Sequence, residues 1–108
     1  MANLYGVESE DDCRREIDEL LALVEQARAQ PTKDTVGALN SRLTYYYKRG
    51  DSQKGRNQMS RVEESYFGAA VQGAYVERPN LNERSEWNSA LYEVEEDLQY
   101  YRPKEPKA

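Results

Sequence analysis

Apolar residues recur along this chain at intervals of three and four, which is the spacing of one face of an α-helix. The recurrence falls into four segments separated by prolines, glycines and polar residues, and no segment alternates with the two-residue period of a strand. The pattern predicts an all-α fold, a single-domain antiparallel bundle of about four helices over residues 1–108. The predicted parts are an N-terminal arm at 1–8, helices at 9–30, 33–49, 58–77 and 82–101, and a tail at 103–108.

Capping residues set the ends of the first two helices. Ser9 is a favoured N-cap, and Pro31 ends the helix that follows because the residue before a proline avoids the α conformation. Either Thr32 or Asp34 is expected to cap the second helix, and Gly50 is expected to stop it.

The third helix carries an unusually wide apolar arc. One face is followed closely by a second, so the arc exceeds half of the circumference. Such a helix is either central to the bundle or faces another chain. The residues of the arc are Met59, Val62, Tyr66, Phe67, Ala69, Ala70, Val71, Gly73, Ala74 and Val76.

The fourth helix has a narrow stripe, and the arm has two candidate anchors, Leu4 and Tyr5. Asn80 and Glu83 have the spacing of a capping box before the fourth helix, and Pro103 ends it. The stripe consists of Trp87, Leu91, Val94, Leu98 and Tyr101.

The residue types remove most catalytic chemistry. The chain has no histidine, which excludes the commonest general base and His-based zinc sites. The single cysteine, Cys13, lies on the apolar face of the first helix, where it is expected to be a buried small hydrophobe. We expect no catalytic residues, no cofactor and no metal. No apolar run approaches the roughly 20 residues of a membrane span, and no signal peptide follows Met1, so no membrane association and a cytoplasmic location are expected.

Carboxylates offer one alternative. Residues Glu16 to Leu20 resemble the first acidic motif of all-α nucleotide pyrophosphohydrolases of the MazG kind. The resemblance implies magnesium-dependent nucleotide hydrolysis, with Glu16 and Glu19 facing carboxylates of the fourth helix. It covers five residues, and Val94 stands where the second motif requires an acid three positions before Asp97. A magnesium-dependent carboxylate hydrolase is therefore the third of three hypotheses for the function.

Charge is strongly segregated along the chain. The net charge is −5, yet residues 33–61 hold seven basic and two acidic residues, while the segments on either side are acidic. The basic segment, with the tyrosine that lies opposite its core stripe, forms a candidate binding surface at one end of the bundle. Its residues are Arg42, Tyr45, Lys48, Arg49, Lys54, Arg56 and Arg61. This surface indicates a second function, nucleic-acid binding, in which cations hold phosphates and a ring stacks on a base.

Tyrosine usage favours protein binding over both alternatives. Nine tyrosines accompany one phenylalanine and one tryptophan, and tyrosine buries large area at interfaces while keeping a polar group. The first-ranked function is a non-enzymatic interaction module with a protein partner, such as a small acidic inhibitor, adaptor or assembly subunit of a nucleic-acid-handling complex. A homo-oligomer, and contact with nucleic acid through the complex, stay open. The candidate interface residues are Phe67, Val71, Tyr75, Tyr92 and Tyr100.

Overall fold

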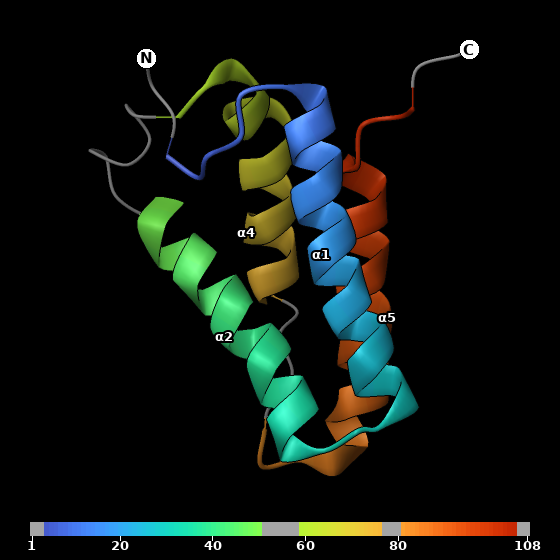
Figure 1. The fold of residues 1–108 in the computed structure, drawn as a ribbon. Helices are drawn as coiled ribbons and strands as arrows, with labels where there is room; N and C mark the ends of the chain where they lie inside the picture. Colours follow the sequence, from blue (N-terminus) through green and yellow to red (C-terminus); the bar gives the residue numbers. More distant parts are fainter. Residues whose placement is uncertain (1–3, 51–58, 77–80, 106–108) are drawn as a thin grey trace.

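The computed structural model of the protein describes residues 4–50, 59–76 and 81–105. The described chain is all-α, as predicted, and no strand occurs within these three ranges. The elements are α1 (Glu10–Ala29), α2 (Lys33–Gly50), the π-helix η1 (Glu63–Phe67), α4 (Gly68–Val76), which continues from η1, and α5 (Arg84–Tyr101) (Figure 1).

The helices form a closed ring of neighbours. α1 packs against α2 and α5, and α4 packs against the same two helices from the other side (Figure 1). Because α4 faces two helices and η1 contacts α1, these contacts account for the buried part of the wide apolar arc of the third helix. Its fully buried members are Phe67, Ala70, Val71 and Ala74.

The core consists of apolar residues at helical spacing, although Tyr101 of the predicted α5 stripe is only partly buried and Ala90, outside that stripe, is buried. On α1 the spacing of three and four places five side chains inside, and α2 and α5 do the same. Burial of each leucine-sized side chain contributes about 1.5–3 kcal/mol relative to exposure, so these stripes hold the bundle together. The buried residues of the three helices are Cys13, Ile17, Leu20, Val24, Ala27, Val36, Leu39, Leu43, Tyr46, Trp87, Ala90, Leu91, Val94 and Leu98.

The caps of α1 and α2 lie where side-chain chemistry predicts. Ser9 Oγ accepts the N–H of Asp12 at 3.1 Å. At the start of α2 the cap is Thr32 and not Asp34, because Thr32 Oγ1 accepts the N–H of Thr35 at 3.2 Å. α2 includes Gly50 as its last residue, one position beyond the predicted end.

The other two helices begin later than predicted. The third is helical from Arg61, because Ser60 is its cap: Ser60 Oγ accepts the N–H of Glu63 at 3.1 Å, and Glu63 Oε1 accepts the N–H of Ser60 at 2.8 Å. The fourth begins at Arg84 after Glu83, whose side chain makes no cap bond. Asn80 and the predicted limits of the third helix, 58 and 77, lie outside the described residues.

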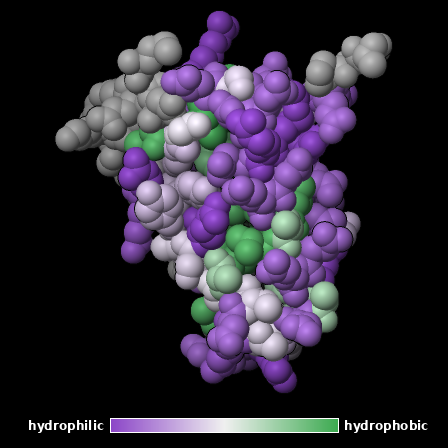
Figure 2. All heavy atoms as spheres, in the orientation of Figure 1, coloured by the Kyte–Doolittle hydropathy of each residue, from purple (hydrophilic) through white to green (hydrophobic). Residues whose placement is uncertain are grey.

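The outer surface is mostly hydrophilic. On the face that carries α1, hydrophobic residues reach the surface in small scattered patches, one of them near the middle of the view (Figure 2). None of the described helices combines the length and the apolar character that a membrane crossing needs.

Candidate functional site

The N-terminal arm is fastened to the end of the bundle by one buried carboxylate. Glu63, at the start of η1, is fully buried. Its Oε1 accepts the N–H of Leu4 at 2.8 Å, and its Oε2 accepts the N–H of Tyr5 at 2.5 Å and that of Val7 at 3.0 Å. With the N–H of Ser60, four backbone donors surround the carboxylate. They supply the hydrogen bonds without which a buried carboxylate is very costly.

Two further side chains hold the backbone carbonyls of the arm. Ser60 Oγ donates to the carbonyl of Val7 at 2.6 Å, and Arg49 Nη2 donates to the carbonyl of Leu4 at 3.0 Å. Leu4 and Val7 are buried. We call Glu63, Ser60 and Arg49 the arm clasp. These contacts confirm Leu4 as an anchor. The arm clasp forms its hydrogen bonds with backbone groups of the arm and not with its side chains.

Tyr5 is the second anchor, and its ring inserts among aromatic residues. The ring centroid of Tyr5 lies 5.8 Å from that of Tyr46 and 5.0 Å from that of Phe67. The centroids of Tyr46 and Phe67 lie 5.1 Å apart, and all three pairs have edge-to-face geometry. The Tyr5 hydroxyl is buried without a hydrogen-bond partner among the described residues. Burial, with the nearby Glu63 charge, raises its pKa to about 12 although Arg49 acts in the opposite direction.

The π-helical turn η1 explains why residue 68 is a glycine. The N–H of Gly68 donates to the carbonyl of Glu63, five residues earlier. A Cβ atom at position 68 would lie 2.7 Å from that carbonyl oxygen, which is closer than real Cβ contacts. The π-turn therefore requires glycine at this position. π-Turns are frequent at functional sites, and this one directs Glu63 at the arm.

The predicted basic surface is partly assembled, and two of its arginines already have partners. Arg42 Nη2 donates to the Tyr46 hydroxyl at 3.0 Å and lies 3.4 Å from a carboxylate oxygen of Glu19. Arg49 lies over the ring of Tyr45, 5.5 Å from its centroid, besides its bond to the arm. Lys48 and Arg61 are exposed, and Lys54 and Arg56 lie outside the described residues.

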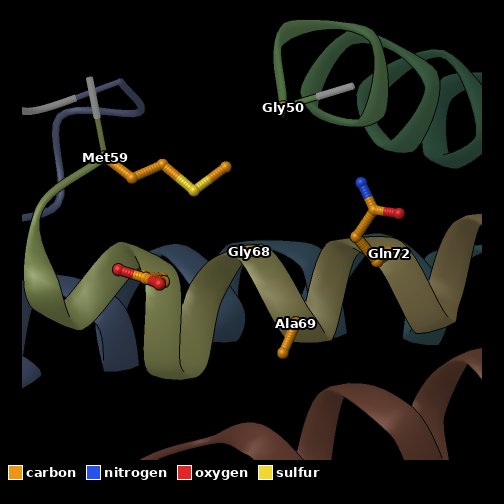
Figure 3. Close-up of a pocket in the computed structure, with 6 residues that line it drawn as sticks. Gly50, Met59, Gly68, Ala69 and Gln72 are labelled. Carbon is orange, nitrogen blue, oxygen red and sulfur yellow. The ribbon is translucent and has the colours of Figure 1, made fainter. Parts of the chain in front are cut away.

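Sequence reasoning did not find a small pocket between the end of α2 and the third helix. Its volume is about 300 Å³, at the lower limit for ligand pockets, and the Met59 side chain extends across it (Figure 3). Small residues leave the space, and Glu64 and Gln72 supply polar groups. The other lining residues are Gly50, Gly68 and Ala69. The pocket is large enough for one side chain of a partner.

The candidate interface residues divide into two groups. Phe67 and Val71 are fully buried in the core, so neither can contact a partner while the bundle is intact. The sequence placed them on a second, outer side because periodicity does not show how many helices surround α4. Tyr75 is half-buried and stacks on Tyr47 with centroids 3.8 Å apart. Tyr92 and Tyr100, by contrast, are 57% and 80% exposed.

The two exposed tyrosines share one face of α5 with three acidic residues. Tyr92, Glu96 and Tyr100 follow at intervals of four, and Glu93 and Asp97 lie beside them at helical spacing. Nothing in the described part of the chain forms an ion pair with these three carboxylates. Partial burial, then repulsion from Glu96 and Glu93, raises the pKa of Asp97. We call these five residues the α5 outer face, of which Asp97 is the partly buried edge, beside Gly73 of α4.

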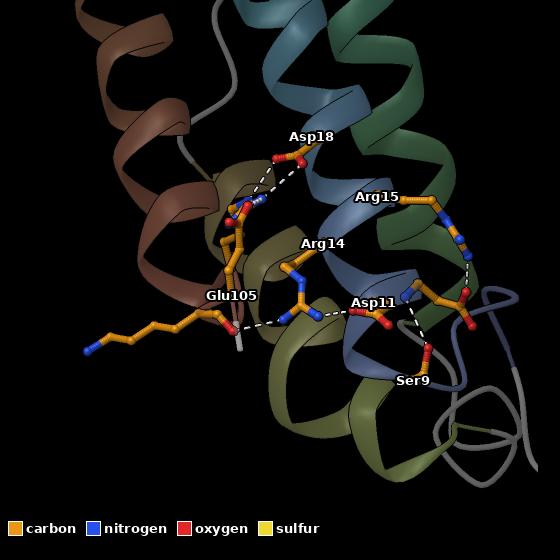
Figure 4. A network of polar contacts seen from close by, with 9 residues as sticks. Ser9, Asp11, Arg14, Arg15, Asp18 and Glu105 are labelled. Carbon is orange, nitrogen blue, oxygen red and sulfur yellow. Dashed lines mark hydrogen bonds and ion pairs between the residues drawn. The ribbon is translucent and has the colours of Figure 1, made fainter. Parts of the chain in front are cut away.

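Acidic residues elsewhere in the described chain are paired more often. Arg102 binds both carboxylate oxygens of Asp18, at 2.8 and 3.0 Å, and this pairing lowers the pKa of Asp18 (Figure 4). Arg28 lies 2.5 Å from Glu95. Arg14 pairs with Asp11, and Arg15 with Asp12 (Figure 4). The unpaired carboxylates of the α5 outer face differ from these.

The hydrolase hypothesis requires a metal site. In residues 4–50, 59–76 and 81–105, no group of three potential metal ligands is placed to hold a metal ion. Glu16 and Glu19 instead face Arg42 across the α1–α2 contact. Cys13 is buried, as predicted, and burial raises the pKa of its thiol to about 12, so the thiol is protonated at neutral pH.

The chain matches no protein-family model, no curated protein and no solved structure.

Proposed function

We propose that the protein is a non-enzymatic interaction module and that the α5 outer face contacts its protein partner. One observation carries the proposal: Tyr92 and Tyr100, 57% and 80% exposed, flank Glu96 on a helix face that is directed away from the core. The remaining described tyrosines, apart from Tyr45, are at least partly buried.

The chemistry of tyrosine supports this choice of surface. A tyrosine ring offers large apolar area with few rotatable bonds, and its hydroxyl can form a hydrogen bond when a partner covers it. Aromatic anchors of this kind carry much of the binding energy at protein interfaces. Tyr100 also contacts Tyr101 edge-to-face at 4.9 Å, which restricts its ring before binding.

The acidic character of the face suits a particular role. A small inhibitor, adaptor or assembly subunit with this face would cover a basic surface, including those of nucleic-acid-handling complexes, which carry basic residues to bind phosphates. We propose this role for the protein. In a homo-oligomer built on this face, the occupant would instead be a second copy.

Site-directed photo-crosslinking tests the proposal. A photo-reactive amino acid replaces Tyr100 in one protein and the equally aromatic, exposed Tyr45 in a matched control. We expect position 100 to yield a defined protein adduct from the native source that unlabelled wild type suppresses and a Tyr92→Ser/Tyr100→Ser competitor does not. Adducts at position 45 alone, or suppression by both competitors, would contradict the choice of the α5 outer face.

Nucleic-acid binding is the second candidate, and the exposed pair of Tyr45 and Arg49 favours it. A guanidinium 5.5 Å from an exposed ring can accompany base stacking and phosphate contact. The engagement of Arg42 with carboxylates weakens this candidate. Salt-sensitive oligonucleotide binding that is lost in a variant with Lys48, Arg49, Lys54 and Arg56 changed to alanine would support it. Absence of binding at low salt would exclude it.

A further inference from the structure

We propose that the α5 outer face binds an arginine- and lysine-rich segment of the partner protein. The inference rests on the proposed function and specifies the chemistry of the partner. It follows from the unpaired carboxylates, from the exposed rings beside them and from how the chain uses its own arginines.

The first support is uncompensated charge. Glu93 is three residues from Glu96 and four from Asp97, so the three carboxylates are neighbours on the helix surface. Like charges at this spacing repel one another, and the pKa of Asp97 is raised by partial burial first and by that repulsion second. A cationic ligand would replace this repulsion with attraction.

The second support is the ring chemistry within this protein. Three guanidinium groups already lie over aromatic rings, at 5.6 Å for Arg42 on Tyr46, 5.5 Å for Arg49 on Tyr45 and 5.5 Å for Arg84 on Trp87. Tyr92 and Tyr100 offer the same kind of ring beside carboxylates. An arginine placed there gains an ion pair and a cation–π contact at once.

The third support concerns the source of the cations. Almost every described arginine is engaged within the chain, by a carboxylate, a carbonyl or a ring, and Arg61 is the exception among them. A second copy could offer Arg61 and exposed lysines such as Lys48, but it would have to break existing contacts to supply any other described arginine, which favours a different protein as the source of arginine side chains. The engaged residues are Arg14, Arg15, Arg28, Arg42, Arg49, Arg84 and Arg102.

The spacing of the face defines the segment. Tyr92 and Tyr100 are eight residues apart, which corresponds to roughly 12 Å along the helix. An extended segment covers this distance in about four residues, and its side chains on one side repeat every second residue. Two or three basic residues in alternation, or at helical spacing, therefore match the carboxylates between the rings.

Peptide titration tests the inference with full-length protein. A short fluorescent peptide of alternating arginine and serine is compared with a glutamate–serine peptide by anisotropy. We expect binding of the arginine peptide only, weakened by salt. The variant Glu93→Gln/Glu96→Gln/Asp97→Asn should bind about tenfold more weakly, since exposed ion pairs contribute about 0.2–1 kcal/mol each. Tyr92→Ser/Tyr100→Ser should also weaken binding, and Tyr45→Ser should not.

A matched control separates a specific surface from general attraction. The variant Glu25→Gln/Asp34→Asn/Glu83→Gln removes the same number of charges at exposed positions elsewhere and should bind the peptide as wild type does. Equal losses in the two triple variants would overturn the inference. So would self-association in light scattering that the first triple variant abolishes, because the occupant would then be a second copy.

The peptide test and the crosslinking test can fail separately. If no basic peptide binds while position 100 still yields its specific adduct, the cationic partner is wrong and the interaction face stands. If both fail, the proposed function is wrong as well.

Discussion

A Cβ atom on Gly50 would lie 2.2 Å from the hydroxyl oxygen of Tyr5, so the last residue of α2 and the anchor of the arm share one space. The hydroxyl is buried and has no hydrogen-bond partner in residues 4–50, 59–76 and 81–105, and the aromatic carbon that bears it would lie 3.5 Å from the same Cβ, an ordinary contact. The absence of a side chain at position 50 therefore permits tyrosine, in place of phenylalanine, at position 5.

The first prediction concerns the coupling of these two residues. Gly50→Ala alone should destabilise the protein by about 1–3 kcal/mol, because overpacking displaces the Tyr5 ring. Tyr5→Phe alone should be neutral or stabilising, because it removes a buried hydroxyl that has no partner. In the double variant the cost of Gly50→Ala should largely vanish. Urea unfolding of the four proteins measures the coupling, and additive changes would contradict it.

The second prediction concerns alkaline pH. The pKa of Tyr5 is raised to about 12 in the folded state from about 10 in the unfolded state. The folded state therefore holds the Tyr5 hydroxyl proton more tightly than the unfolded state does. The contribution of this difference to the free energy of unfolding is complete below pH 10 and is lost as the pH rises from 10 through 12. The unfolding free energy of wild type should fall more steeply over this window than that of Tyr5→Phe. Parallel curves would show that Tyr5 is not the cause.

The third prediction concerns the arm clasp. Glu63→Gln replaces one carboxylate oxygen with an amide NH2, which cannot accept the backbone N–H bonds that this oxygen receives. The loss should cost about 2–3 kcal/mol, and hydrogen exchange at Leu4, Tyr5 and Val7 should accelerate. The neighbouring exposed Glu64→Gln is the matched control and should leave these amides protected. Unchanged exchange in Glu63→Gln would mean that the carboxylate does not hold the arm.

The fourth prediction concerns the π-turn. Gly68→Ala should destabilise the protein despite the higher helix propensity of alanine, because its Cβ would lie 2.7 Å from the carbonyl oxygen of Glu63. Gly37→Ala, on α2 with no atom within 4 Å of the new Cβ, should stabilise it by about 0.5–1 kcal/mol. Thermal unfolding compares the two; a stabilising Gly68→Ala would indicate that the π-turn is readily converted to α-helix.

How far sequence predicts this structure depends on whether the determining contacts are local. Ser9 and the apolar spacing of α1 lie within one helix, so its limits were predicted to within one residue. Ser60 and Glu63 form an equally local capping box at the start of the third helix. The apolar pattern extends back to Met59, so it predicts a start that is too early.

The long-range features were harder to predict. That Glu63 binds Leu4, 59 residues away, could not be inferred, because a glutamate so completely buried runs against the ordinary placement of charged residues. Phe67 and Val71 were placed on an outer side since spacing reveals a face but not what covers it. Tyr92 and Tyr100 were placed correctly outside the core because the angle from the Trp87 stripe decides their exposure.

The long separation within the arm clasp bears on how the protein is made. A ribosome synthesises a chain from its N-terminus to its C-terminus, so Leu4, Tyr5 and Val7 are made before α1 and α2, and their hydrogen-bond acceptor, Glu63, is made after both helices. Throughout that interval the arm of the nascent chain lacks the carboxylate that holds its backbone N–H groups. The arm is thus synthesised before α1 and α2 but is secured only after them.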